Sequence, residues 1–174
     1  MLVWRISSLR HAAQAFSGEG GLKYPARWHH KGTLIVYTSS TLSLAALEMF
    51  ANLKPQDIST ELVAISAEIP DGVTIRSVDA SKLPRNWREY PGPPSLQALG
   101  SGWVESRESA VLSVPSALIP AERNYLISPA HPDFRRLKIH SPAPFSFDSR
   151  MWKQTRSPSS TLGRAPASRR PPGK

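Results

Sequence analysis

The chain has 174 residues, of which 40% are hydrophobic and 20% are charged, and it carries a formal net charge of +9. This length and composition fit one globular domain with a substantial core, and no run of about 18 apolar residues suggests a membrane span. The lack of cysteine excludes disulfides, thiolate nucleophiles and thiolate metal sites. Because the N-terminal residues lack the apolar stretch of a secretory signal, we expect a soluble, cytoplasmic protein.

The positive charge is concentrated at the C-terminus. Residues 151–174 contain six basic residues and no acidic residue, which leaves a net charge of +3 for residues 1–150. The segment 154–174 is rich in Pro, Ser, Arg and Ala and has too few large apolar residues to offset its ordering entropy. We therefore predict one domain over residues 1–153 and a disordered basic tail over 154–174, without specific binding to nucleic acid.

The predicted elements start with a strand over residues 1–8. The next stretch, residues 10–25, is rich in glycine and is predicted to form an irregular loop that can bend or approach a ligand closely. A second strand is predicted over residues 32–39, because residues 34–36 form an apolar run typical of a buried strand. Two strands joined by a long irregular connection are therefore expected at the start of the fold.

A helix is predicted next, over about residues 41–53, with Ser40 or Thr41 as its N-cap and Pro55 as its stop. Most of its surface is apolar, but one stripe at the helical period is small and polar; it consists of Thr41, Ala45, Glu48 and Asn52. Glu48 is the only acidic residue of this helix. Spacing alone favours an ordinary solvated position for Glu48 over a place in a functional site.

The second half of the chain is predicted to add several short strands. Residues 61–70 alternate, with one apolar face made of Val63, Ile65, Ala67 and Ile69. Residues 72–79 are predicted to pair with them in a hairpin, after a turn at Asp71-Gly72. A short helix over about 95–107 precedes three more predicted strands, at 110–120, 124–129 and 134–142. Many strands with few helices predict an α+β fold with a mixed, largely antiparallel sheet.

Five short motifs occur in order along the chain. They are "ARWHHKGTLIVYTSSTLSLAALEMF" at 26–50, "LPRNW" at 83–87, "GSGWVES" at 100–106, "VPSALIPAERNYLISPAHPDF" at 114–134 and "FDSRMW" at 147–152. Each motif is weak alone, but in this order they resemble the RES-domain family over residues 3–152. The resemblance implies a fold similar to that of ADP-ribosyltransferase toxins, and the predicted tail has no counterpart in the family.

The resemblance also implies a set of site residues for the cleavage of NAD. The family takes its name from an arginine, a glutamate and a serine, which match Arg27, Glu48 and Ser116. Arg27 fits the diphosphate, with Arg5 as a second candidate, because a guanidinium binds phosphate oxygens in a two-pronged fashion. Tyr37 fits stacking on the nicotinamide ring, and Glu48 fits stabilisation of the positive charge that grows on the ribose. Ser116 fits a hydrogen bond to ribose or phosphate, and Glu48, Arg27 and Tyr37 are the expected catalytic residues.

Each of these residues also has a structural interpretation. Arg27 fits a salt bridge, Tyr37 a core position with a satisfied hydroxyl, and Ser116 a turn. Within the later motifs, Asn124 is interpreted as a turn hydrogen bonder and His131 as part of a fixed corner. The tryptophans of the motifs are expected in the core; they are Trp28, Trp87 and Trp103.

Three places depart from the family pattern. Pro25-Ala26 stand before Arg27 where the family usually has two glycines, and His29 stands where it has an asparagine. Ser128 replaces a further common asparagine. Because alanine does not readily adopt a positive φ, the loop before Arg27 is expected to differ in geometry from that of the family. The residues of the family name are retained, so activity is expected.

We therefore expect an enzyme that degrades NAD at the nicotinamide–ribose bond, by hydrolysis or by phosphorolysis. NAD is its substrate, phosphate is a candidate second substrate, and no cofactor or metal is predicted because the five histidines form no ligand pattern. The resemblance implies a toxin with an Xre-type antitoxin as partner, and it leaves an oligomer open. The alternatives are transfer of ADP-ribose to a macromolecule and a non-enzymatic basic module that binds through the tail.

Overall fold

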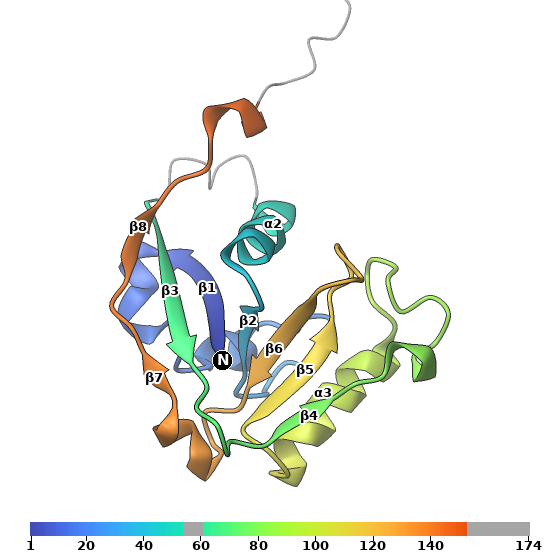
Figure 1. The fold of residues 1–174 in the computed structure, drawn as a ribbon. Coiled ribbons are helices and arrows are strands. Elements are labelled where there is room, and N and C mark those ends of the chain that lie inside the picture. Colours follow the sequence, from blue (N-terminus) through green and yellow to red (C-terminus); the bar gives the residue numbers. More distant parts are fainter. Residues whose placement is uncertain (54–60, 153–174) are drawn as a thin grey trace, which may run out of the picture.

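The structure is a computed structural model that describes residues 1–53 and 61–152 (Figure 1). The strands are β1 (Leu2–Ser8), β2 (Val36–Ser39), β3 (Leu62–Glu68), β4 (Ile75–Ser77), β5 (Val111–Pro115), β6 (Arg123–Ile127), β7 (Lys138–Ile139) and β8 (Ala143–Phe145). The α-helices are α1 (Glu19–Lys23), α2 (Leu42–Asn52) and α3 (Pro94–Ser106), and 3₁₀ turns cover Leu9–Gln14, Ala80–Lys82, Pro132–Arg136 and Ser149–Trp152. The predicted helix stop at Pro55 and the predicted tail over 154–174 lie outside the described residues.

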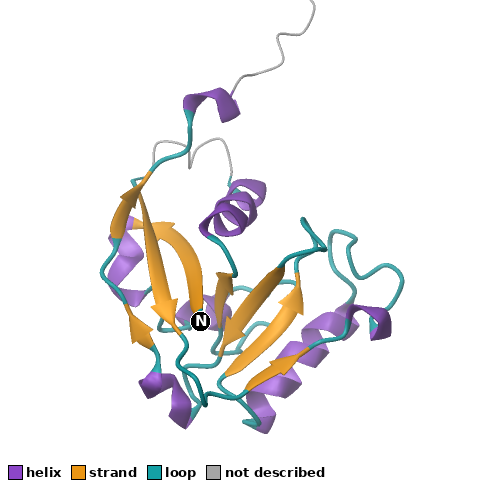
Figure 2. Ribbon diagram, viewed as in Figure 1, coloured by secondary structure: helices purple, strands orange, loops and turns teal. Residues whose placement is uncertain are grey.

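The strands form one curled sheet in the order β4-β5-β6-β2-β1-β3-β7, and β8 also pairs with β3 (Figures 1 and 2). Each pairing between the strands given above is antiparallel except that of β4 with β5. The predicted α+β class with a mixed, largely antiparallel sheet is confirmed. Because β2 lies between β1 and β6, residues from both halves of the chain meet at the centre of the sheet.

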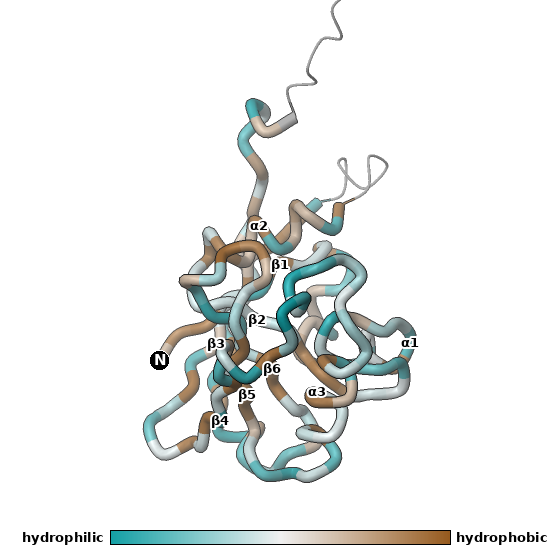
Figure 3. The backbone as a smooth tube through the Cα atoms, turned by 90° about the vertical axis from the view of Figure 1, so that its right-hand side faces the viewer, coloured by the Kyte–Doolittle hydropathy of each residue, from teal (hydrophilic) through white to brown (hydrophobic). Residues whose placement is uncertain are grey.

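The main core lies on one face of this sheet. It collects buried side chains from strands on both sides of β2, among them Val3, Val36, Ile65, Val111 and Ile127. Ala15 and Phe16, from the connection between β1 and β2, pack into the same cluster. The predicted apolar face of β3 is buried there, which confirms that prediction. In Figure 3 the apolar colour gathers along the strands and the hydrophilic colour along many of the connecting loops.

Two helices cover the other face of the sheet. Helix α3 packs on β5 and β6 through Leu96 and Trp103, whereas α2 packs on β1 and β3 through Ala45. Helix α3 also approaches the main chain of the segment before β2, because a Cβ at Gly100 would lie 1.8 Å from the carbonyl oxygen of Trp28. Only glycine fits at this contact. The loop that carries Arg27 is therefore held directly against α3.

The connection between β1 and β2 is more regular than predicted. Instead of an irregular loop, residues 10–25 contain most of a 3₁₀ turn and the whole of α1. Glycine serves close packing here, because a Cβ at Gly21 would lie 2.2 Å from the carbonyl oxygen of Thr33. The predicted strand over 32–39 is shorter than expected. Within this stretch, only Val36–Ser39, which form β2, pair with neighbouring strands.

The predicted hairpin between residues 61–70 and 72–79 is wrong. Asp71 and Gly72 do form a turn, in which Gly72 has a φ of +83°. The following strand, β4, nevertheless pairs in parallel with β5. Strand β3 already has β1 on one side and β7 and β8 on the other, so β4 finds no open edge there. The strand predicted over 134–142 shrinks to β7, because the preceding residues form a 3₁₀ turn.

Candidate active site

Glu48 lies in the second half of α2, and this helix is fixed at its start. The Thr41 hydroxyl accepts a hydrogen bond from the main-chain nitrogen of Leu44 at 3.0 Å, which confirms Thr41 as the N-cap. Ala45, which precedes Glu48 on the same helical stripe, is buried against the sheet. The stripe therefore turns toward the sheet, and Glu48 is half-buried at its edge. An ordinary solvated position for Glu48 does not describe this arrangement.

One carboxylate oxygen of Glu48 receives two hydrogen bonds from the sheet. Its Oε1 accepts from Ser116 Oγ at 2.9 Å and from Asn124 Nδ2 at 2.6 Å. Asn124 is held in turn by Ser39, whose Oγ donates to Asn124 Oδ1 at 2.7 Å. Within residues 1–53 and 61–152, no hydrogen-bond donor reaches Oε2 of Glu48. The carboxylate is therefore oriented through one oxygen while the other stays free for a ligand.

Ser116 follows β5 directly and is fully buried. Its Oγ accepts hydrogen bonds from the main-chain nitrogens of Leu118 and Ile119, at 3.2 and 3.1 Å. These two donors leave the hydroxyl proton of Ser116 directed at Glu48. Ser116 is thus both the turn residue and the partner of the glutamate, whereas its hydrogen bond to ribose or phosphate stays a prediction.

Asn124 is a member of this network that the sequence reasoning missed. Its interpretation as a turn hydrogen bonder is wrong, because it lies within β6 directly opposite Ser39 of β2. The ladder register puts these two side chains on the same face as Tyr37 and Leu126. The sequence did contain an indication of this role. Asn124 lies two residues before Leu126 and so shares its core-facing side of the strand, where a polar side chain needs a buried partner.

Tyr37 is anchored by its hydroxyl. The ring of His29 bridges two oxygens, with Nε2 3.0 Å from the Tyr24 carbonyl and Nδ1 2.8 Å from the Tyr37 hydroxyl. A carbonyl only accepts, so Nε2 donates, and the neutral ring then accepts at Nδ1 from Tyr37. The same hydroxyl accepts from the main-chain nitrogen of Trp28 at 3.1 Å. Burial raises the pKa of Tyr37 well above its usual range, so its proton stays in this network.

His29, one of the departures from the family pattern, thus holds Tyr37 in place. Burial lowers the pKa of the His29 ring; the hydrogen bond to the Tyr24 carbonyl opposes this effect, and the neighbouring His30 adds to it. His29 is buried and His30 is exposed. The sequence therefore contains two adjacent histidines of which only the first belongs to the site, through the orientation that it gives to Tyr37.

A pH dependence of stability follows from His29. As the pH falls below about 6.5, the unfolded chain binds a proton at this position before the folded chain does, so stability present above that pH is lost. We expect His29→Asn to reduce the fall in the urea midpoint between pH 7 and pH 5, whereas His30→Asn leaves the wild-type slope. Parallel profiles for wild type and His29→Asn would contradict the assignment.

Arg27 faces the loop between β4 and α3. Its Nη1 donates to the carbonyl oxygens of Trp87 at 2.6 Å and Glu89 at 2.9 Å. Burial lowers the pKa of Arg27, and the nearby Glu48 carboxylate is the main influence that opposes this effect. No carboxylate of the described chain forms an ion pair with Arg27, so the predicted salt-bridge alternative is not what the structure shows. The Nε and Nη2 atoms of Arg27 make no hydrogen bond to any residue in 1–53 and 61–152.

Arg5 lies behind Tyr37, where β1 diverges from β2. The two strands share one register pair, Trp4 with Ser39, and beyond it Arg5 Nη1 donates to the free main-chain carbonyl of Tyr37 at 2.9 Å. Burial lowers the pKa of Arg5, and its Nε is covered without a hydrogen-bond partner in the described structure. Arg5 as a whole is half-buried, and no carboxylate of residues 1–53 and 61–152 forms an ion pair with it.

His131 and the three motif tryptophans have structural positions, as predicted. His131 caps the 3₁₀ turn that follows it, since its Nδ1 accepts from the main-chain nitrogen of Asp133 at 3.1 Å. Trp28 and Trp103 are buried, and Trp87 packs partly buried against the same cluster. The structure thus brings Arg27, Tyr37, Glu48 and Ser116 together around β2 and places Arg5 directly behind them.

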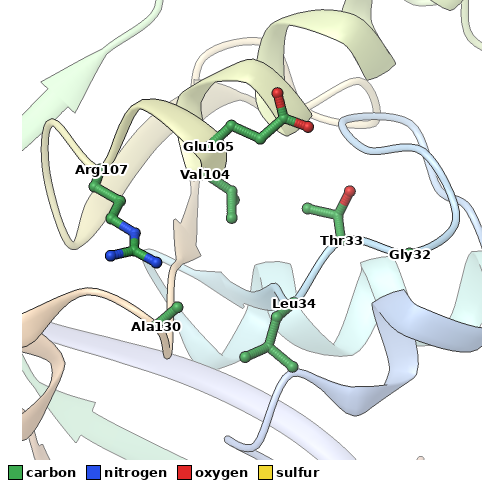
Figure 4. Close-up of a pocket in the computed structure, with 7 residues that line it drawn as sticks. All are labelled: Gly32, Thr33, Leu34, Val104, Glu105, Arg107 and Ala130. Carbon is green, nitrogen blue, oxygen red and sulfur yellow. The ribbon is translucent and has the colours of Figure 1, made fainter.

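Other features of the described residues do not form a competing site. A hollow of about 400 Å³ lies between α3 and the segment before β2, and it is lined by Gly32, Thr33, Leu34, Val104, Glu105, Arg107 and Ala130 (Figure 4). None of the predicted site residues lines it. No group of three or more histidine, aspartate or glutamate side chains in residues 1–53 and 61–152 is arranged to hold a metal. None of the helices seen there is long and apolar enough to cross a membrane.

Comparison with known proteins gives a consistent family match. The model of the RES domain matches residues 2–148. A Yersinia enterocolitica protein named Toxin Res is 36% identical over 152 residues, which cover 87% of this chain and 99% of the relative. A Sphingobium protein named Prs ADP-ribosylating toxin is 34% identical over 152 residues, which cover 85% and 94%. The chain is therefore similar to these relatives over nearly their whole length.

The fold is also similar to a solved structure. The crystal structure of the MbcT–MbcA toxin–antitoxin complex of M. tuberculosis contains a chain that superposes with a TM-score of 0.66. The two sequences are 14% identical, and the match covers 83% of this chain and 84% of the other. The likeness is one of fold, and with it the predicted resemblance to the ADP-ribosyltransferase fold is confirmed.

Proposed function

This chain belongs to the RES domain family, and on that basis we propose that it is a toxin that cleaves the nicotinamide–ribose bond of NAD. The observation that carries the proposal is the environment of Glu48. Two hydrogen bonds fix its Oε1, no donor of the described residues reaches its Oε2, and the guanidinium of Arg27 is close enough for their charges to interact. An oriented anion next to a cation suits a substrate in which an emerging positive charge is joined to a diphosphate.

In this proposal each site residue binds a different part of NAD. When the glycosidic bond breaks, its electron pair leaves with the nicotinamide nitrogen, and the ribose carbon becomes positive. Glu48 stabilises that charge and accepts a hydrogen bond from a ribose hydroxyl through Oε2. Tyr37 offers its ring to the nicotinamide, and its hydroxyl, tied to His29 and Trp28, fixes the ring plane. A ring held in this way loses little entropy when the substrate stacks on it.

The two arginines supply the positive charge for the diphosphate. Among the described residues, nothing bonds Nε or Nη2 of Arg27, while main-chain carbonyls hold Nη1, so the guanidinium is already oriented for a two-pronged contact. Arg5 is a half-buried cation that pairs with no carboxylate of the described residues, and its contact with the Tyr37 carbonyl keeps it next to the ring platform. A bound anion would compensate this charge, which supports the role of Arg5 as a second diphosphate residue.

The acceptor distinguishes the variants of the reaction. Water gives ADP-ribose and a proton, phosphate gives ADP-ribose 1″-phosphate, and a macromolecule gives a covalent ADP-ribosyl product. The name of the Sphingobium relative favours the last as the second candidate function. An antitoxin, of the Xre type that the family resemblance implies, is the proposed protein partner, and the fold likeness to the toxin of a toxin–antitoxin complex supports such a partner.

One assay tests the proposal. We expect the purified protein to release nicotinamide from NAD, and the products formed with and without phosphate identify water or phosphate as the acceptor. Radiolabelled NAD with cell extract tests the second candidate, because transfer to a macromolecule leaves label on that macromolecule. A protein that releases no nicotinamide under any of these conditions would contradict the proposed function.

A further inference from the structure

The connection between β4 and α3 forms the wall of the site on the side of Arg27. We call residues 84–93 of this connection the Tyr90 loop. Arg27 Nη1 holds the loop through two of its carbonyl oxygens, and a Cβ added at Gly92 would lie 3.0 Å from the same nitrogen. On the opposite side, Arg88 Nε donates to the carbonyl of Ala117, in the turn that follows Ser116, at 3.1 Å. The loop is therefore pinned on two sides of the site.

Tyr90 projects from this pinned loop into solvent. Its exposed fraction is 89%, the highest among the large apolar side chains of the described residues. Prolines follow it at positions 91, 93 and 94, so the backbone next to Tyr90 has restricted freedom. Tyr90 directly follows Glu89, whose main-chain carbonyl accepts the hydrogen bond from Arg27 Nη1 at 2.9 Å. A rigidly presented, solvent-exposed aromatic ring therefore stands beside the proposed diphosphate residue.

We propose that Tyr90 is the platform on which the adenine ring of NAD stacks. The inference rests on the proposed function and adds to it the binding of the half of the substrate that does not react. The groups of NAD are joined in the order nicotinamide, ribose, diphosphate, ribose and adenine. With the first ribose at Glu48 and the diphosphate at Arg27, the second ribose and the adenine lie beyond Arg27. The Tyr90 loop, which wraps the guanidinium of Arg27, lies there. Stacking of a base on tyrosine is a common mode of recognition and needs only an exposed ring face.

Such a platform makes the protein select dinucleotides. Binding energy from the adenosine half would lower the KM for NAD without changing the chemical step, because Tyr90 does not touch the reacting atoms. A nicotinamide mononucleotide has no adenine and gains nothing from the platform. A role of Tyr90 in docking a protein partner would instead leave nucleotide binding unchanged when the ring is removed.

Two variants and two readouts test this proposal. We expect Tyr90→Ala to raise the KM for NAD about tenfold with kcat within twofold of wild type, and Tyr90→Phe to retain the wild-type KM, since phenylalanine keeps the ring. Binding of ADP-ribose, measured by calorimetry without turnover, should weaken by the same factor in Tyr90→Ala only. If the wild type cleaves NAD and Tyr90→Ala shows no change in KM or in affinity for ADP-ribose, the inference about Tyr90 is wrong while the proposed function stands. Failure of the wild type to cleave NAD would instead contradict the proposed function, and the calorimetry would still test the platform.

Discussion

A Glu48→Gln variant is expected to release nicotinamide from NAD at least about a hundredfold more slowly than the wild type, with little change in KM. The substitution removes the negative charge next to the ribose, and losing one such electrostatic contact in a water-poor site costs about 3 kcal/mol of transition-state stabilisation. The glutamine oxygen can still accept from Ser116 and Asn124, so the α2–sheet contact is retained. Initial rates of nicotinamide release at saturating NAD measure the effect.

Glu105→Gln provides the matched control, because Glu105 is exposed on α3 and lies outside the Glu48 network. We expect it to retain wild-type rates. Thermal unfolding of both variants should occur near the wild-type temperature, which separates a lost charge from a lost fold. A Glu48→Gln enzyme with full activity would contradict the mechanism.

An Arg27→Ala variant is expected to raise the KM for NAD by about a hundredfold. Two charge-assisted hydrogen bonds to the diphosphate would be lost, each worth about 1.5 kcal/mol or more, and about 3 kcal/mol corresponds to a factor of about 150. Arg27→Lys keeps a cation but loses the planar fork, so we expect a KM between those of wild type and Arg27→Ala. Steady-state kinetics over a wide NAD range and calorimetry with ADP-ribose measure both variants.

The control for Arg27 is Arg76→Ala. Arg76 is an exposed arginine on β4 whose partner is Glu108, at 2.8 Å, so it tests the general effect of removing one positive charge. Since Arg27 also holds the Tyr90 loop, proteolysis of that loop in Arg27→Ala reports on the lost main-chain contacts. If the affinity for ADP-ribose is unchanged in Arg27→Ala, the assignment of the diphosphate to this residue is wrong.

Local sequence patterns predicted the elements that carry the site better than the contacts between them. Helix α2 and its Thr41 cap were readable, because capping and the helical period act over a few residues. The strand that pairs with β4 was not predictable. The turn at Gly72 forms as expected, but β3 has no open edge with which β4 could pair. Strand pairing depends on the whole sheet, which short patterns do not contain.

The site shows the same division. The family pattern named Glu48 and Ser116, but neither spacing nor pattern indicated that the serine hydroxyl binds the glutamate directly. Asn124 was missed because its function depends on its register with Ser39, across 85 residues of sequence. The sequence showed His29 only as a departure from the family asparagine and gave it no role, whereas its ring supplies the acceptor for the Tyr37 hydroxyl. Such roles follow from contacts made only after the sheet has formed.

The central position of β2 has a consequence for how the protein is made. Asn124 is synthesised 76 residues after Glu48, and it reaches the carboxylate only when β6 pairs with β2. A chain still on the ribosome and shorter than this already contains Arg27 and Tyr37 but lacks the strand that orients Glu48. On the proposed function, NAD cleavage therefore begins only late in translation.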